Sequence, residues 1–454
     1  MGRKIQVCAL SLMAAFGYTT SAFAQAAEAP KPAEPAAAPA PAAEPAPAPA
    51  PATEPAPAAA APAPAAEPAP APAPAPAPDA VPATTFESLK VESKNGSASL
   101  KVGLLLQPQY EAIGSPDALH EGTSNNIFLR RTRLLVGGTL FKTFEYFFDT
   151  DSPNLFKGDL AATNGMNPAP ASGQKNGFGI GVQDAFATWK AYEDMIKFDA
   201  GYMLTPGAHN ALQGAGTLLG LDYFANSFNH QNVFNNAGGA PAGRDAGVEV
   251  RGLLLGNHIE YRAGLFQGLR KPGTVPPMAG TAGDVAAQNM FRFAGRLQIN
   301  LLDAETGFFY AGTYLGKKKV VSIGAAVDLQ GGYHHWAVDG FADLPLGPGT
   351  LTAQVNFGKW NGNTFTALTN QTAIMAEAGY RIDGIGLAPI VKFEQQNIAD
   401  SDAANTRFGG GLGWFPYGHN INLKAFFTNI NAKPATGDSH SYNQFQLQWQ
   451  LYFY

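Results

Sequence analysis

The sequence predicts an all-β protein, a transmembrane antiparallel β-barrel preceded by a disordered Pro/Ala-rich arm. Three observations lead to this prediction. From residue 99 to residue 454, apolar and polar residues alternate in segments separated by turn residues. The last of these segments ends on three aromatic residues, which are typical of an interface between lipid and water. No apolar run is long enough for a membrane-spanning helix, so a helical membrane protein is excluded.

Residues 1–24 have the three parts of a secretory signal peptide. Two basic residues near the start are followed by a mostly apolar stretch, residues 5–18, and by Ala22-Phe23-Ala24 at the expected cleavage site. An uncleaved membrane anchor is the alternative, but the apolar stretch is shorter than the ~20 residues that span a bilayer. Cleavage after Ala24 would remove Cys8, the single cysteine, so we expect no disulfide or zinc-thiolate site in the mature chain.

Residues 25–83 consist almost entirely of Pro and Ala. Because closely spaced prolines exclude helix and sheet, we expect a semi-rigid, polyproline-II-like spacer in the periplasm, with an upper-limit reach of roughly 180 Å at ~3.1 Å per residue. Its sparse charge is mainly acidic, so it should not adhere to anionic lipid. We expect residues 26–83 to contact peptidoglycan in the cell wall or, alternatively, a periplasmic protein. A short linker, residues 84–98, would then lead into a barrel of residues 99–454.

The charge balance gives no reason to expect a strongly charged partner. The whole chain has 30 basic and 35 acidic residues. Three of the bases and six of the acids lie before residue 84, which leaves the predicted barrel at about −2. A nucleic-acid partner is therefore not expected.

The clearest predicted strand is the last one, residues 441–454. One face is apolar and the other is mostly glutamine; the apolar face comprises Asn443, Phe445, Leu447, Trp449, Leu451 and Phe453. A large soluble β-sandwich would also alternate and is the alternative fold. A lipid-facing stripe, a wet lumen face and interfacial aromatic residues explain the segment better. We expect outer-membrane lipids to contact this stripe and the barrel-assembly machinery to recognise it.

Sixteen such strands can be counted. They are residues 99–111, 126–140, 142–151, 181–191, 195–205, 246–256, 258–267, 289–301, 319–330, 335–344, 349–360, 370–381, 384–396, 405–416, 419–431 and 441–454. The stretch 306–315 could make a seventeenth, but bacterial single-chain barrels have an even strand number. We therefore predict that residues 303–318 form a long periplasmic turn.

The spacing of the strands predicts longer loops at one end of the barrel and short turns at the other. Residues 112–125, 152–180, 206–245 and 268–288 would be outer loops, and Asp383-Gly384 a periplasmic turn. A barrel of sixteen strands leaves an aqueous channel, whereas eight strands would be filled by side chains.

Several short motifs resemble the early and middle strands of the phosphate-selective porin O and P family. They are Phe128-Leu129-Arg130-Arg131-Thr132-Arg133, Gly137-Gly138-Thr139, Phe147-Phe148-Asp149, Gly201-Tyr202, Thr205-Pro206, Gly243-Arg244-Asp245-Ala246-Gly247-Val248, Phe266-Gln267-Gly268 and the run from Gly312 to Lys319. The resemblance implies a trimeric Gram-negative porin whose third outer loop, residues 206–245, folds into the lumen. It also implies a ladder of arginines along the pore. Arg131 and Arg133 match the start of that ladder.

The candidate site residues follow from strand parity and from this loop. The inward-facing bases that could contact anions are Arg131, Arg133, Arg251, Arg262, Arg292 and Arg296, and the candidate constriction residues are Asn210, Asp222, Asn229 and His230. Between Pro206 and Gly243 there is no Lys or Arg, although an anion-selective constriction needs fixed positive charges. Arg131 and Arg133 could equally well pair with Glu145 and Asp149 on the neighbouring strand.

Two functions from different classes fit the sequence. The first is a porin for passive diffusion of small hydrophilic solutes or ions, with anions such as phosphate among the candidates. The alternative is a structural barrel that tethers the envelope or acts as an adhesin, and an outer-membrane hydrolase ranks third. We expect no enzyme activity, no cofactor and no metal site. His334 and His335 would point to opposite faces of a strand, and we expect them to be solvated in an outer loop.

Overall fold

The computed structural model describes residues 88–115, 122–158, 179–221, 243–268, 271–272, 286–288, 290–362, 370–399 and 401–454. The predicted signal peptide and Pro/Ala-rich arm lie outside the described residues. Within the described ranges, no helix combines the length and the apolar character needed to cross a bilayer.

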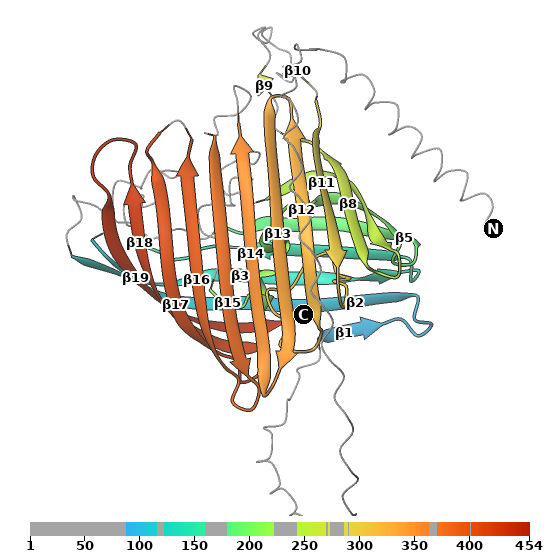
Figure 1. The fold of residues 1–454 in the computed structure, drawn as a ribbon. Helices are drawn as coiled ribbons and strands as arrows, with labels where there is room; N and C mark the ends of the chain where they lie inside the picture. Colours follow the sequence, from blue (N-terminus) through green and yellow to red (C-terminus); the bar gives the residue numbers. More distant parts are fainter. Residues whose placement is uncertain are drawn as a thin grey trace, which may run out of the picture. The chain divides into compact units, whose positions relative to one another are not determined.

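Sixteen antiparallel strands of the described chain form one closed barrel, which confirms the predicted fold and strand number (Figure 1). Neighbouring strands in the sequence pair with each other, β8 pairs with β11, and β19 pairs with β2 to close the barrel. The barrel strands are β2 (Ala98–Gly114), β3 (Thr123–Leu140), β4 (Phe144–Asp151), β5 (Gly181–Tyr192), β6 (Ile196–Leu204), β7 (Arg244–Leu254), β8 (Ile259–Phe266), β11 (Arg292–Asn300), β12 (Val320–Gln330), β13 (Tyr333–Leu346), β14 (Gly349–Asn361), β15 (Gln371–Ile382), β16 (Leu387–Ile398), β17 (Ala404–Trp414), β18 (Ile421–Lys433) and β19 (His440–Phe453). Two short strands, β9 (Lys271–Pro272) and β10 (Ala286–Gln288), pair with each other between β8 and β11.

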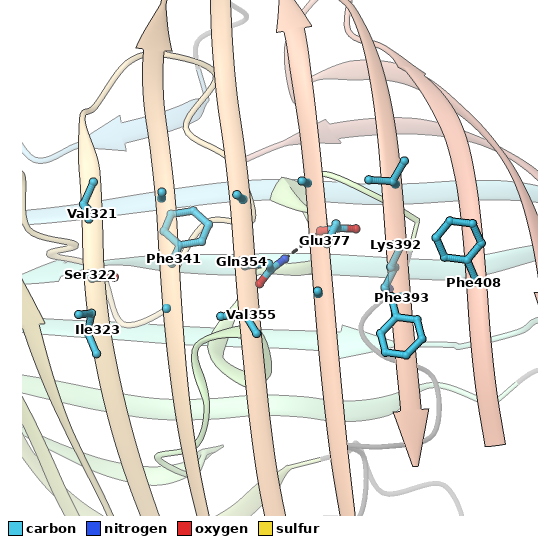
Figure 2. Close-up of a pocket in the computed structure, with 16 residues that line it drawn as sticks. Val321, Ser322, Ile323, Phe341, Gln354, Val355, Glu377, Lys392, Phe393 and Phe408 are labelled. Carbon is cyan, nitrogen blue, oxygen red and sulfur yellow. Dashed lines mark hydrogen bonds between the residues drawn. The ribbon is translucent and has the colours of Figure 1, made fainter. Parts of the chain in front are cut away.

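The two faces of the barrel wall differ as the sequence predicts. Along β12, Asp328 is buried on the inner face while its neighbour Val327 is exposed on the outer face. Figure 2 shows the same alternation farther along the wall, where Gln354 donates a 2.8 Å hydrogen bond to Glu377. Both of these side chains are buried, whereas Val355 is exposed. The period-two pattern of a strand therefore sorts polar groups inward and apolar groups outward.

The two ends of the barrel have different connections. At the end where β2 begins and β19 finishes, called the turn end here, short turns such as 141–143, 193–195 and 347–348 join the strands. The four connections predicted to be long outer loops all lie at the opposite end, called the loop end. The connection between β12 and β13 also lies at the loop end, but it is only two glycines long. Gly331 has a φ of 57°, which glycine adopts readily and which allows so tight a turn.

A further strand, β1 (Leu89–Glu92), lies within the segment that the sequence predicts to be a linker. It pairs with the first residues of β2, with Leu89 opposite Val102. On the same edge of β2, Phe453 of β19 lies opposite Leu104. Because β1 continues the line of β19, the edge of β2 stays paired beyond the point where β19 ends.

The histidine pair in β13 corrects one expectation. His334 and His335 lie within the strand instead of a solvated loop, because the two-residue connection before it lets β13 begin at Tyr333. They do point to opposite faces: His334 is exposed, and His335 is buried and stacked on Trp360 with ring centroids 4.5 Å apart.

Candidate functional site

All six arginines predicted as candidate anion contacts lie on the inner face of one part of the wall. Arg131 and Arg133 belong to β3, and the others belong to β7, β8 and β11. Each is at most 8% exposed. The six residues are Arg131, Arg133, Arg251, Arg262, Arg292 and Arg296.

Five of these arginines form ion pairs with carboxylates of the wall. The pairs are Arg133 with Asp151 at 2.9 Å and Asp149 at 3.8 Å, Arg251 with Asp199 at 2.7 Å, Arg262 with Glu260 at 2.8 Å, Arg292 with Asp328 at 2.6 Å, and Arg296 with Asp339 at 2.6 Å. Glu145, the other proposed wall partner, instead accepts from Lys190 at 2.9 Å. Arg131 donates to Gln107 at 2.9 Å. Carboxylates thus offset the positive charge along this wall locally.

The pair between Arg296 and Asp339 crosses an intervening strand. Arg296 is on β11 and Asp339 on β13, and Gly324 of β12 lies between them. A Cβ atom at Gly324 would lie 2.2 Å from Nη2 of Arg296 and 2.7 Å from Oδ1 of Asp339. A glycine is therefore required for the guanidinium to reach its carboxylate.

The first part of the connection after β6, residues 205–221, lies inside the barrel and is called the loop segment here. It contains two short 3₁₀ turns, η1 (His209–Leu212) and η2 (Ala215–Thr217). Asn210, a predicted constriction residue, is buried; its N–H donates to Asn356 at 3.1 Å and its side chain donates to Gln213 at 2.9 Å. The other three predicted constriction residues, Asp222, Asn229 and His230, lie outside the described residues.

Basic side chains of the wall hold the backbone of the loop segment. Arg296 donates to the carbonyl of Gly207 at 3.0 Å. Lys424 donates to the carbonyls of Leu218 and Gly220 at 2.6 and 2.8 Å. Because these cations bind buried carbonyl groups, they satisfy loop backbone that has no strand partner. Arg296 and Lys424, which the alternation of their strands places inside the barrel, thus position the loop segment.

A second segment, residues 301–319 between β11 and β12, also folds into the barrel from the turn end, and it is called the turn segment here. It forms no regular strand, as the sequence predicts, but it was not predicted to enter the lumen. Phe308 and Tyr310 are buried. Gln213 and Tyr310 form a parallel bridge, in which Tyr310 donates its N–H to Leu212 at 2.9 Å and Gly214 donates to Tyr310 at 2.8 Å. The loop and turn segments therefore meet inside the barrel.

The wall also holds the turn segment directly. Arg262 donates to the carbonyl of Phe308 at 2.8 Å. Thr313 donates to Asp343 at 2.8 Å, and Arg381 donates to the carbonyl of Leu315 at 3.0 Å. The signal that could have revealed this arrangement is the aromatic run Phe308-Phe309-Tyr310, because such residues are out of place in a solvated turn.

A buried contact between a histidine and a carboxylate joins the two segments. His209 of the loop segment and Glu305 of the turn segment lie 2.9 Å apart, and both are at most 1% exposed. The imidazole is stacked between Tyr310 and Phe341, with centroid distances of 4.7 and 4.2 Å. Burial acts to raise the pKa of Glu305, but His209 and hydrogen bonds from Tyr314 and Gln298 hold that pKa below its usual range.

A cavity of about 310 Å³ remains between these segments and the wall formed by β2 to β5. The loop segment contributes residues 213–217, and the turn segment contributes Phe309, Tyr310 and Lys318 among others. Arg133 is the one predicted anion contact that lines it. Among the described residues, no cluster of three or more His, Cys, Asp or Glu side chains could hold a metal ion.

The chain is similar in structure to several outer-membrane channels at low sequence identity. The anion-selective porin from Comamonas acidovorans is 12% identical, with 78% of this chain and all of that chain covered and a TM-score of 0.49. The outer membrane channel DcaP of Acinetobacter baumannii is 11% identical, with 81% of this chain and all of that chain covered and a TM-score of 0.48. OmpF of Salmonella typhi, in complex with daunomycin, is 12% identical, with 80% and 100% covered and a TM-score of 0.44.

No protein-family model matches the chain. No curated protein matches it in sequence either. The resemblance to the phosphate-selective porin O and P family therefore stays a prediction.

Proposed function

We propose that this protein is an outer-membrane porin, a water-filled channel for passive diffusion of small hydrophilic solutes or ions. The observation that supports this most is the closed barrel of sixteen strands with an apolar outer face and a polar inner face. In hydrocarbon every backbone polar group needs a partner within the protein, and a closed barrel supplies one. A wall with exposed apolar side chains and buried charges suits lipid outside and water inside.

Exposed aromatic side chains near the barrel ends support a membrane location. Phe141, Phe144, Tyr192 and Tyr417 lie at or next to turns of the turn end and are all more than 40% exposed. Such residues form girdles at the two membrane interfaces of barrel proteins. We propose that the turn end faces the periplasm and that the protein assembles as a trimer in the outer membrane.

Planar bilayers test this proposal against the structural alternative. Purified protein should give discrete current steps in a chloride salt solution, whereas an envelope tether or adhesin barrel would give none. The same protein after boiling is the control for contaminating channels, because boiling unfolds the barrel. Folded, heat-modifiable protein that gives no steps would overturn the porin proposal.

We propose weak ion selectivity with a modest anion preference, because the inner arginines are largely paired with carboxylates. Changing Arg131→Ala and Arg133→Ala together should lower the chloride-to-potassium permeability ratio by about twofold. The change removes two positive charges and leaves Asp151 without its 2.9 Å partner. Reversal potentials in a salt gradient measure this ratio.

A matched control and a contradictory outcome complete that experiment. Lys359→Ala removes a base that is exposed on the outer surface, so it should leave the reversal potential unchanged. A phosphate site with micromolar affinity that blocks chloride current would show that the channel is phosphate-selective in spite of these ion pairs.

We propose that the Pro/Ala arm contacts peptidoglycan and takes no part in permeation. Deleting residues 26–83 while keeping the signal peptide and its cleavage site should leave single-channel conductance unchanged and reduce co-sedimentation with peptidoglycan. Peptidoglycan digested with lysozyme is the control for non-specific sedimentation. A rise in conductance would mean that the arm enters the lumen, which would contradict the spacer role.

A further inference from the structure

The cavity between the turn segment and the β2–β5 wall has a largely aromatic lining. Six aromatic residues contribute, from β4, β19, the chain end and the turn segment: Phe147, Phe309, Tyr310, Tyr314, Tyr452 and Tyr454. Phe147 makes edge-to-face contacts with Phe309 and with Tyr454, with centroid distances of 5.4 and 5.5 Å. Leu105 and Leu135 complete the apolar surface. A predominantly aromatic lining with a few polar groups is typical of sites for small organic molecules, and ~300 Å³ is large enough for one.

The charged groups of the cavity are three cations, Arg133, Arg244 and Lys318, and two carboxylates. The carboxylates are Asp149 and Asp184, and each is near an arginine: Arg244 lies 3.0 Å from Asp184, and Arg133 lies 3.8 Å from Asp149. Arg133 also lies 2.9 Å from Asp151, which is outside the lining, so both arginines of the cavity are paired with carboxylates. Lys318 is then the cation of the lining that favours a solute with one negative charge.

Lys318 is the cation that differs from the two arginines. Its ammonium group donates to the carbonyl of Ala304 at 3.1 Å and lies 5.4 Å from the centre of the Tyr314 ring. Among the described residues no carboxylate lies within ion-pair distance of it. The ammonium group keeps further donor capacity, because it has three protons. It can therefore bind an anionic oxygen at the edge of the aromatic surface.

We propose that this cavity is a binding site for a small aromatic carboxylate on its way through the channel. This inference rests on the proposed porin function and names a solute class for it. The ring of the solute packs against Phe147, Phe309 and Tyr452, since aromatic pairs favour edge-to-face and offset arrangements. Its carboxylate accepts a hydrogen bond from Lys318. Acetate has the charge without the ring, and benzyl alcohol has the ring without the charge.

Block of chloride current tests the site, with benzoate as the probe. Benzoate added to open channels in a planar bilayer should reduce the current at concentrations about tenfold lower than acetate or benzyl alcohol, since both halves of the solute are bound. Lys318→Gln should raise the half-blocking concentration of benzoate about fivefold, and Phe309→Leu should raise it by a similar factor. Lys317→Gln is the matched control, because Lys317 is the exposed neighbour of Lys318 and does not line the cavity.

The outcomes separate failure of the site from failure of the channel. Absence of chloride current from folded wild-type protein would overturn the porin proposal itself. Normal chloride current that benzoate and acetate reduce equally would overturn only the aromatic site. Equal block by benzyl alcohol and benzoate would overturn the role of Lys318. Benzoate block that neither Lys318→Gln nor Phe309→Leu weakens would place the block elsewhere and overturn this cavity as its site. Heat-modifiable mobility on gels shows for each variant that the barrel is folded.

Discussion

Replacing residues 304–318 with an Asn-Gly turn should raise the single-channel conductance by about two- to threefold. A sixteen-stranded barrel leaves an aqueous channel unless other chain fills it, and the turn segment places Phe308, Phe309 and Tyr310 inside the barrel. The design preserves the wall, because the N–H of Asp303 already donates to the carbonyl of Lys319 at 2.9 Å. A two-residue Asn-Gly turn joins strands at that spacing. Conductance of the variant in planar bilayers gives the result directly.

The wall residues that hold the turn segment should tolerate its removal. Arg262 and Asp343 lose their partners Phe308 and Thr313, but water that enters the lumen can solvate them. Lys317→Gln, which keeps the segment and removes an exposed charge, should show wild-type conductance. Unchanged conductance in folded barrels that lack residues 304–318 would mean that another part of the chain forms the narrowest section of the pore.

The barrel could be predicted from the sequence because its information is local. Each strand shows its period-two pattern within its own residues, as in β12, where Val327 and Asp328 differ in polarity and face opposite sides. Strand ends were predicted to within a few residues, since turn residues mark them. The inward position of all six candidate arginines follows from the same parity.

The partners of those arginines are harder to predict than their positions. Arg133 and Asp151 face each other across one hairpin, so the register after a short turn determines their contact. Arg296 and Asp339 meet across β12 only because Gly324 has no side chain. A single sequence gives no register across two strands, so this pair could not be predicted.

The inward fold of the turn segment could not be predicted because it lacks any periodic pattern. Its position depends on contacts that are distant in sequence, such as the pair between His209 and Glu305 and the bridge between Gln213 and Tyr310. The even strand number expected of a bacterial barrel argues against a seventeenth strand at residues 306–315, and the structure confirms that no barrel strand forms there. The aromatic residues that made a strand plausible instead pack against the inner wall.

Deleting Tyr452 to Tyr454 should reduce insertion into the outer membrane at least about tenfold. In β19, Tyr452 and Phe453 lie opposite Leu105 and Leu104 of β2, where the barrel closes. Without them this stretch of β2 has an unpaired edge between β1 and the shortened β19. Each unsatisfied backbone group in hydrocarbon costs on the order of several kcal/mol, so a small gap is enough to disfavour the inserted state. The amount of heat-modifiable protein in outer-membrane fractions measures the effect.

A variant of full length separates backbone closure from side-chain chemistry. Tyr452→Phe, Phe453→Leu and Tyr454→Phe together keep the strand, its apolar character and the two hydrogen bonds of 2.8 Å that link the backbone of residue 452 to Asn420. This variant should insert at close to the wild-type level, because it keeps closure against β2 and also the apolar stripe that we expect the assembly machinery to recognise. If the three-residue deletion also yields normal amounts of heat-modifiable barrels in the outer membrane, the closing pairs between β19 and β2 are not needed for assembly, and pairing of β1 with β2 must be enough to seal that edge.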